Sequence, residues 1–281
     1  MNDKIVPLPG LHRYDQPGYF PLAELPQRQS IADQALDTGW WELDQIFKFY
    51  LGQLVIVTGI AGHGKSTFLL NLLCNIARKH SVHSFLYVPE NEGYLRDKLR
   101  LIWNDDVTFA HFAETQCFVQ SAIPDHFDDR PKTLQWVLEK AVVAIEYDQV
   151  DIVMIDPWNE LERAKPRDML MTDYIGECLM YLKNFCRACN VTVIIVAHPT
   201  KAVTEHGGRT ATMADIEGSM NWFNKCDNGL VVVRDPEKNT ARVISAKVRE
   251  IGAGKLGVCH FHVDPNTGIY TPQYGAFEAR P

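Results

Sequence analysis

The sequence predicts an α/β protein with a mainly parallel sheet, helices on both faces and an antiparallel extension at its C-terminal end. Two observations indicate this class. Runs such as "DIVMID" and "VTVIIVA" are apolar throughout, which is typical of strands covered on both faces. From Leu51 onwards such runs alternate with helical patterns, as parallel strands joined by crossover helices require.

The elements follow in chain order. We expect an N-terminal arm or linker over residues 1–37, with a short helix in "QSIADQAL", and one motor-sized domain over 38–281. The expected strands cover residues 53–58, 84–88, 116–120, 151–155, 191–197, 229–233, 241–248 and 257–263. The expected helices cover residues 65–79, 93–103, 132–147 and 172–189. Helical patterns stop near residue 228, so the last three strands are predicted to form the antiparallel extension.

The composition excludes several classes of protein. A hydrophobic content of 46% with 22% charged residues is that of a globular chain. No run approaches the ~20 apolar residues that a membrane span needs, and the N-terminus lacks a signal pattern, so we expect a cytoplasmic protein without a membrane partner. Seven cysteines without framework spacing fit reduced thiols. The net charge of −7 argues against a surface covered with nucleic-acid contacts, although it allows a local basic channel.

A phosphate-binding loop is the strongest motif. The stretch "GIAGHGKS" at residues 59–66 fits G-x-x-x-x-G-K-[ST] between a strand and a helix. Its glycines let backbone N–H groups turn inwards, and the helix N-terminus adds a positive partial charge. Lys65 is expected to reach the β- and γ-phosphates of ATP, and Ser66 to bind Mg²⁺. The expected nucleotide contacts are Gly59, Gly62, His63, Gly64, Lys65, Ser66 and Thr67.

Polar residues after other strands are predicted to share this edge of the sheet, because ligands bind beyond the carboxyl ends of parallel strands. Asp156 ends "DIVMID" and is expected to be the second magnesium ligand. Glu90 follows "SFLYVP" and is the expected water-activating base, with Glu92 as the second choice. His198 follows "VTVIIVA" and is expected to contact the γ-phosphate or relay its presence. Taken singly, each also fits an ordinary turn or core position.

In this order the motifs resemble the RecA-like motor domain of DnaB-type hexameric helicases, in a pattern nearest to the Twinkle and phage primase-helicase branch. The resemblance covers roughly residues 38–270. "YVPEN" resembles the segment with the catalytic glutamate, "MIDPWNELE" the metal aspartate, "IIVAHPTK" the sensor and "SAKVREIGAGKLG" the finger strand. It implies a P-loop NTPase that hydrolyses ATP between the subunits of a homo-oligomeric ring of six while moving on single-stranded DNA.

The resemblance also assigns residues near the C-terminal end. Lys247 and Arg249 lie two apart on a strand, so their side chains point the same way. The resemblance implies that they deliver positive charge to a neighbour's γ-phosphate, whereas K-x-R alone is more often a solvated edge. Tyr270 is expected to stack on the nucleotide base.

Contacts with DNA are expected from the basic loops after Asp156 and His198, through phosphates of the strand. Ordinary solvated loops are the alternative. The residues concerned are Lys165, Arg167, Lys201 and Arg209.

Other functions remain open at this point. A RecA-fold recombination or regulatory ATPase, or a slow nucleotide-binding adaptor that loads another replication protein, would carry the same phosphate loop. The family's collar or primase-like domain has no room before residue 38. The sequence is therefore expected to be a natural motor-only protein, an excised domain, or a component that works with a separate primase or loader.

Overall fold

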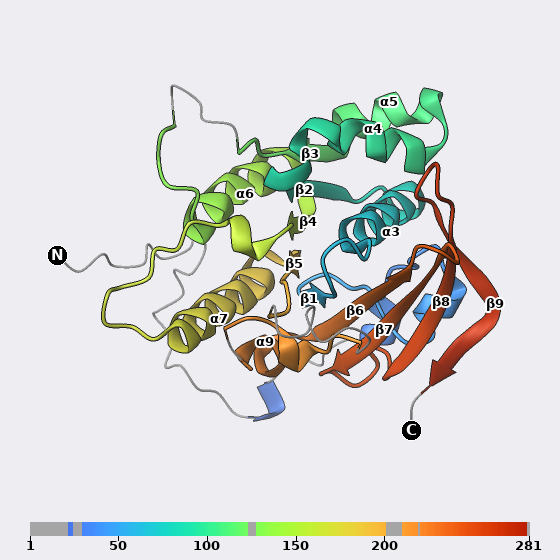
Figure 1. Ribbon diagram of the computed structural model, residues 1–281. Helices are drawn as coiled ribbons and strands as arrows, with labels where there is room; N and C mark the ends of the chain where they lie inside the picture. The colour runs from blue at the N-terminus through green and yellow to red at the C-terminus, as the bar shows by residue number, and fades with distance from the viewer. Residues whose placement is uncertain (1–21, 25–29, 123–127, 201–209, 219, 280–281) are drawn as a thin grey trace.

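The computed structural model describes residues 22–24, 30–122, 128–200, 210–218 and 220–279. The strands of the described chain are β1 (Leu54–Thr58), β2 (His83–Tyr87), β3 (Cys117–Val119), β4 (Val150–Ile155), β5 (Thr192–Val196), β6 (Asn228–Asp235), β7 (Thr240–Val248), β8 (Gly257–Val263) and β9 (Tyr270–Ala279). Together they form one nine-stranded sheet in the order β3-β2-β4-β5-β1-β6-β7-β8-β9 (Figure 1). The predicted α/β class, with one mainly parallel sheet, is confirmed.

The sheet changes direction at β6. All pairs from β3 to β6 are parallel, and β7, β8 and β9 then add in antiparallel order. The prediction was wrong on β6, which pairs parallel with β1 and therefore belongs to the parallel part. It also omitted β9, which pairs only with β8 in the described sheet and contains Pro272 and Gly275, residues that edge strands tolerate.

Helices cover both faces of the parallel part. Those of the described chain are α1 (Ile31–Gln34), α2 (Trp41–Asp44), α3 (Lys65–His80), α4 (Glu92–Trp103), α5 (Asp106–Thr115), α6 (Leu134–Asp148), α7 (Met171–Cys189) and α9 (Asn221–Lys225). Short 3-10 turns are η1 (Leu22–Glu24), η2 (Pro89–Asn91), η3 (Trp158–Glu160) and η4 (Met213–Asp215). In Figure 1, α3, α4 and α5 lie on one side of the sheet and α6 and α7 on the other. Within the described segments, none of the helices combines the length and the apolar composition that crossing a bilayer takes.

Two hydrophobic cores explain why the parallel strands are apolar throughout. In β1, Val55 and Val57 pack in the core that contains Phe68 of α3. Leu54 and Ile56 face the other way, into the core that contains Phe185 of α7. Alternate residues of one strand therefore serve opposite cores, and both must be apolar. Because the central strands are packed between two layers of helices, the loops that follow them have fixed starting points.

Candidate active site

Four loops meet at the carboxyl-end edge of the parallel strands. The strands β2, β4, β5 and β1 are consecutive neighbours in the sheet. The residues that follow them therefore lie along one edge in the order Glu90, Asp156, His198 and the phosphate loop. The structure brings together the groups that the sequence predicted for one crevice.

The phosphate loop links the end of β1 to the start of α3, and its glycines are required by their surroundings. Gly59 has φ 148°, and a Cβ atom there would collide with the carbonyl oxygen of Val232 on β6. Gly64 has φ 77° and caps α3, and a Cβ atom there would lie 2.7 Å from the Tyr270 hydroxyl oxygen. Any side chain at Gly59 would collide with β6, and any side chain at Gly64 would collide with Tyr270 of β9. Gly64 also has a left-handed backbone conformation, which glycine adopts without strain.

Lys65 extends back along this loop. Its ammonium group donates to the carbonyl oxygens of Gly59 at 2.9 Å and Ile60 at 3.1 Å. Burial lowers the pKa of Lys65, while the nearby charges of Asp156 and Glu90 act against this shift. The cation is therefore desolvated, which strengthens its attraction to an anion, while the two nearby carboxylates offset part of its charge.

Asp156 and Ser66 offer oxygen ligands to a metal ion. Asp156 is 4% exposed, and burial raises the pKa of its carboxyl group, opposed by a hydrogen bond from Ser66 and by the charge of Lys65. Its Oδ2 atom has no hydrogen-bond partner among the residues that the structure describes. A buried, unpartnered carboxylate oxygen beside a hydroxyl group is an oxygen donor set that suits Mg²⁺. The residues present fit that ion.

The two glutamates after β2 have different surroundings. Glu90, in η2, is exposed, and its charge acts on both Lys65 and Asp156. Glu92 instead accepts the backbone N–H of Ala122 at 2.9 Å. Glu90 is therefore exposed at the carboxyl-end edge, whereas the Glu92 carboxylate is used to bind the backbone of the loop at Ala122.

His198 lies beside the same lysine. Burial lowers the pKa of His198, and the charge of Lys65 lowers it further, so the ring is mainly neutral at pH 7. The backbone carbonyl of His198 accepts a hydrogen bond from Glu217 at 3.1 Å. Through this hydrogen bond, His198 is connected directly to the segment that leads into α9.

Tyr270 is not placed as predicted. Its side chain is 2% exposed and packs against Phe68 and Phe261, at 5.7 Å and 5.6 Å between ring centroids. Its hydroxyl group donates to the carbonyl oxygen of Gly64 at 3.2 Å. This burial contradicts the expected stacking on a base, because the ring has no open face, and it makes Tyr270 a support of the phosphate loop.

Arg234 is a residue that the sequence reasoning missed. It lies near the end of β6, and its backbone N–H donates to Nδ1 of His63 at 3.4 Å. Its side chain runs beside Gly64, with Cδ 3.5 Å from where a Cβ atom of Gly64 would stand. Its Nε atom is buried without a hydrogen-bond partner within the described ranges. An arginine that follows the apolar run "GLVVV" was the available signal, once β6 is placed next to β1.

Lys247 and Arg249 lie at the opposite edge of the sheet. Lys247 pairs with Gly229 at the amino end of β6, whereas the phosphate loop follows the carboxyl end of β1. Lys247 donates to the carbonyl of Phe223, and Arg249 donates to the carbonyls of Asn224 and Cys226. The prediction that both side chains point the same way is confirmed, because both contact the C-terminal part of α9.

The basic loop residues are only partly described. Lys165 is half-buried and donates to the carbonyls of Pro166 and Met169, at 3.0 Å and 2.7 Å, so its ammonium group is used within its own loop. Arg167 is exposed. Lys201 and Arg209 lie outside the described residues.

The fold and this edge define the class of protein, a P-loop nucleotide-binding domain with a RecA-like sheet. The chain belongs to the AAA domain family, whose model matches residues 26–203. Membership implies nucleotide binding.

Two known proteins have similar sequences, and the name of one of them is that of a helicase. The "Twinkle homolog protein, chloroplastic/mitochondrial" of Arabidopsis thaliana is 29% identical over 262 residues, with 85% of this chain and 36% of that protein covered. A "Probable replicative DNA helicase" of Trieres chinensis is 21% identical over 257 residues, with 82% of this chain and 56% of that protein covered. The chain thus spans between about a third and just over half of these relatives.

Solved structures share the fold. A structure described as an ATPase domain has a TM-score of 0.69 at 19% identity, over 85% of this chain and 91% of that one. A structure titled "The Structure Of A DnaB-Like Replicative Helicase And Its Interactions With Primase" has a TM-score of 0.68 at 18% identity, over 84% of this chain and 61% of that one. The predicted resemblance to DnaB-type motor domains is confirmed.

Proposed function

We propose that this chain is the ATP-hydrolysing motor domain of a ring-forming replicative DNA helicase. ATP binds at the interfaces between identical subunits, in a ring of six, and the ring moves on single-stranded DNA. The names of both sequence relatives, and of a structural relative described with primase, support this assignment. We place the motor in residues 38–281, with residues 1–37 as an arm, and a primase or loader as a partner.

One observation carries the proposal, namely that the cations of the finger strand lie far from their own phosphate loop. Arg249 donates its backbone N–H to Asp227, just before β6, whereas Gly59 lies against Val232. Five residues of strand separate these two points, which is about 17 Å at ~3.3 Å per residue. This distance exceeds the reach of an arginine side chain. A site that uses both groups is completed by a second copy of the chain.

The proposed chemistry divides between two subunits. In one subunit, Lys65 and the N–H groups of the loop hold the β- and γ-phosphates, and Glu90 accepts a proton from the attacking water. Ser66 and Asp156 would hold a magnesium ion, whose charge would offset that of the phosphates. Neutral His198 hydrogen-bonds the γ-phosphate, and Arg234 adds positive charge beside the loop.

The neighbouring subunit supplies Arg249 and Lys247. Positive charge at the transferring phosphoryl group is worth ~10³–10⁵ in rate in other P-loop enzymes. Hydrolysis is therefore expected to depend on ring assembly.

The test combines three measurements on the full chain. Native mass with and without ATP and single-stranded DNA should show a ring. ATPase activity should rise when single-stranded DNA is added, and a forked duplex should be unwound in the presence of ATP. Lys65→Ala is the control that should fail in the last two assays.

Each alternative predicts a different result. DNA-stimulated hydrolysis without strand displacement would favour a recombination or regulatory ATPase. Nucleotide binding without stimulation would favour a loading adaptor. Either result would overturn the helicase assignment.

A further inference from the structure

Asp227 joins three parts of the chain at the amino-end edge of the sheet. It lies between α9 and β6 and is 4% exposed. Its Oδ2 atom accepts the backbone N–H of Leu54, the first residue of β1, at 3.0 Å. Its Oδ1 atom lies 2.6 Å from Nζ of Lys183 on α7 and 3.5 Å from Nε of Arg249. One buried carboxylate therefore connects β1, α7 and the proposed finger.

The backbone of Asp227 holds the same arginine. Its carbonyl oxygen accepts the backbone N–H of Arg249 at 2.9 Å, while Nε of Arg249 donates to the carbonyl of Cys226 at 3.1 Å. The Arg249 side chain is nevertheless 33% exposed. The guanidinium group is thus held at Nε and also at one terminal nitrogen, which donates to the carbonyl of Asn224, while part of the side chain reaches the surface.

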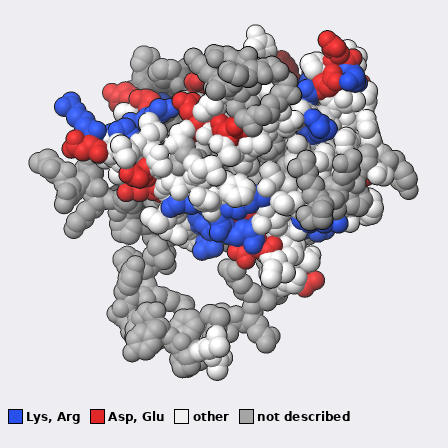
Figure 2. Space-filling view, turned by 60° about the horizontal axis from the view of Figure 1, so that its bottom comes forward, with Lys and Arg blue, Asp and Glu red and all other residues white. Residues whose placement is uncertain are grey.

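The surroundings of Asp227 are strongly basic. Figure 2 turns the bottom of Figure 1, where α9 lies, towards the viewer and shows lysine and arginine side chains gathered there. Lys183, Lys247 and Arg249 all contact carbonyl groups at the end of α9, where the helix dipole favours cations. Their charges repel one another, and the buried carboxylate of Asp227 offsets this repulsion.

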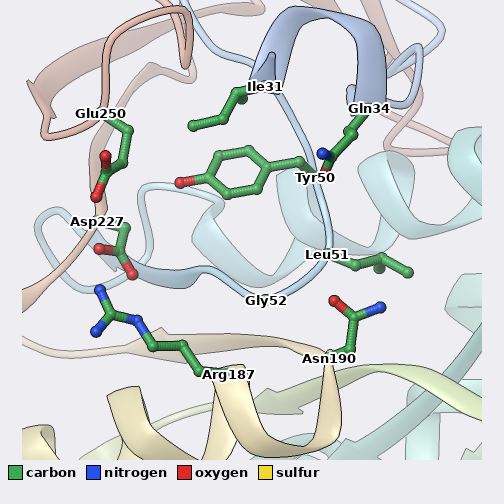
Figure 3. A pocket seen from close by; sticks show the side chains of 9 residues that line it. All are labelled: Ile31, Gln34, Tyr50, Leu51, Gly52, Arg187, Asn190, Asp227 and Glu250. Carbon is green, nitrogen blue, oxygen red and sulfur yellow. The ribbon is translucent and has the colours of Figure 1, made fainter. Parts of the chain in front are cut away.

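Asp227 also lines a cavity of about 260 Å³, together with Tyr50, Arg187, Asn190 and Glu250 among others. In Figure 3 the Arg187 guanidinium group points towards the Asp227 carboxylate. A further cation therefore faces the Asp227 carboxylate in this cavity, where Glu250 supplies a second carboxylate. The negative charge of Asp227, and not only the shape of its side chain, therefore stabilises this cluster of cations.

We propose that Asp227 is a positioning residue, which fixes the direction in which Arg249 leaves the surface towards a neighbouring subunit's phosphate. This inference rests on the proposed function, because it needs a finger that acts between subunits. Without the charge of Asp227, Arg249 loses one of its anchors and competes with Lys183 and Lys247 for the carbonyl groups of α9. The loop side of the same subunit, at the other edge of the sheet, is unaffected.

The test uses Asp227→Asn, which keeps an acceptor for the N–H of Leu54 but removes the charge. Asp151→Asn is the matched control, because Asp151 also accepts the first N–H of a strand, that of His83 at 3.0 Å, away from Arg249. We expect Asp227→Asn to lower kcat by ~10–100-fold, a part of the ~10³–10⁵ that a finger supplies, with nucleotide Kd unchanged. Asp151→Asn should hydrolyse ATP like wild type.

Mixed rings separate a positioning role from a structural one. Arg249→Ala mixed with Lys65→Ala is the reference, and its ATPase activity should exceed the mean of the two variants, because some interfaces pair an intact loop with an intact finger. Asp227→Asn mixed with Lys65→Ala should show the same gain. Asp227→Asn mixed with Arg249→Ala should show none beyond their mean, because the defect of both lies on the finger side.

The outcomes separate the two proposals. If the reference mixture forms rings without a gain, the shared site fails, and this inference fails with it. If the reference gains and Asp227→Asn with Lys65→Ala does not, or if Asp227→Asn alone has wild-type kcat, only the role of Asp227 is overturned. Should Asp227→Asn not fold, Asp227→Glu replaces it, since it keeps the charge but moves it by one methylene. The same pattern is then expected, and wild-type activity would overturn the inference.

Discussion

The two edges of the sheet use their charged side chains in different ways. At the carboxyl-end edge, Glu90 is exposed and Oδ2 of Asp156 has no partner among the residues that the structure describes. At the amino-end edge, Lys183, Asp227 and Arg249 are bonded to one another or to the end of α9. One edge keeps its polar groups for a ligand, and the other holds them against its own chain while part of the Arg249 side chain stays exposed.

This difference follows from how parallel strands are connected. At the carboxyl ends, β2 continues towards α4 on one face and its neighbour β4 towards α7 on the other, and such a switch leaves a crevice for a ligand. At their amino ends the arriving chain is packed against helices, and a buried charge there has to be paired. The proposed function needs both properties, an open phosphate site and a rigid holder for the finger. The variants below test that division, from the largest expected effect to the smallest.

Lys65→Ala should weaken ATP binding and abolish ATP hydrolysis at the carboxyl-end edge of the sheet. It removes the buried cation of the phosphate loop, and hydrogen bonds to charged groups of this kind are worth about 1.5–3 kcal/mol. We expect ATP affinity to fall by ~10–100-fold, measured by calorimetry, and hydrolysis to be lost. Lys79→Ala, at the other end of α3 in a surface ion pair with Asp37, is the control and should bind ATP normally. Equal binding by both variants would contradict the assignment of the loop.

Glu90→Gln should separate binding from hydrolysis. The amide keeps the shape of the side chain but cannot accept a proton from water, so hydrolysis should fall by ~10²–10⁴-fold while ATP affinity stays within about threefold. Glu92→Gln is the control, because the amide oxygen can still accept the N–H of Ala122. A larger loss of hydrolysis in Glu92→Gln, or equal loss of ATP affinity in Glu90→Gln and Lys65→Ala, would remove Glu90 from the role of base.

Much of the fold was predictable because the parallel strands are buried on both faces and therefore apolar at every position. The antiparallel end was harder, since β9 contains Thr271, Pro272 and Gln273, and a strand with one neighbour needs no continuous apolar run. Helix α5 was missed because "DVTFAHFAET" is rich in β-branched and aromatic residues. Its signal was Asp105, whose carboxylate accepts the N–H groups of Val107 and Thr108.

The site residues that follow the ends of parallel strands were predictable. Those that reach the phosphate loop from other strands of the sheet were not. Glu90, Asp156 and His198 each follow a strand of the parallel part within three residues, so strand order brings them together. Arg234 and Tyr270 reach the phosphate loop from β6 and β9, whose positions in the sheet were not fixed by any local pattern. Their roles depend on tertiary packing that spacing does not encode.

Replacing Lys201 and Arg209 together by alanine tests whether the crevice edge also faces DNA. Both follow β5 in sequence and lie outside the described residues. We expect weaker binding to single strands of every sequence, and a slope of log affinity against log salt that is shallower by ~0.7 per lost contact. Arg100→Ala, which breaks a surface ion pair with Asp106, is the control and should leave the slope unchanged. An unchanged slope in the double variant would make these ordinary loop residues.

Tyr270→Phe should have the smallest effect, and it tests how the antiparallel strands support the open edge. The variant keeps the ring and removes only the hydroxyl group that donates to Gly64. Burial raises the pKa of Tyr270 to about 12, so the hydroxyl group is a neutral donor at every working pH. Loss of one such hydrogen bond typically costs about 0.5–1.5 kcal/mol, and the carbonyl oxygen of Gly64 still accepts the backbone N–H of Phe68 at 2.8 Å.

We therefore expect the free energy of unfolding of Tyr270→Phe to fall by that amount in urea titrations, with affinities for ATP and GTP lowered by the same factor of at most about three. A residue that stacked on the base would behave differently. Phenylalanine would stack as well as tyrosine, so stability and affinity would both be unchanged. Tyr147→Phe, at a side chain that is 80% exposed, is the control and should match wild type. If Tyr270→Phe also matches wild type in both measurements, the hydroxyl group does not support the loop, and any role of Tyr270 at the phosphate site comes from its ring, through packing or through stacking.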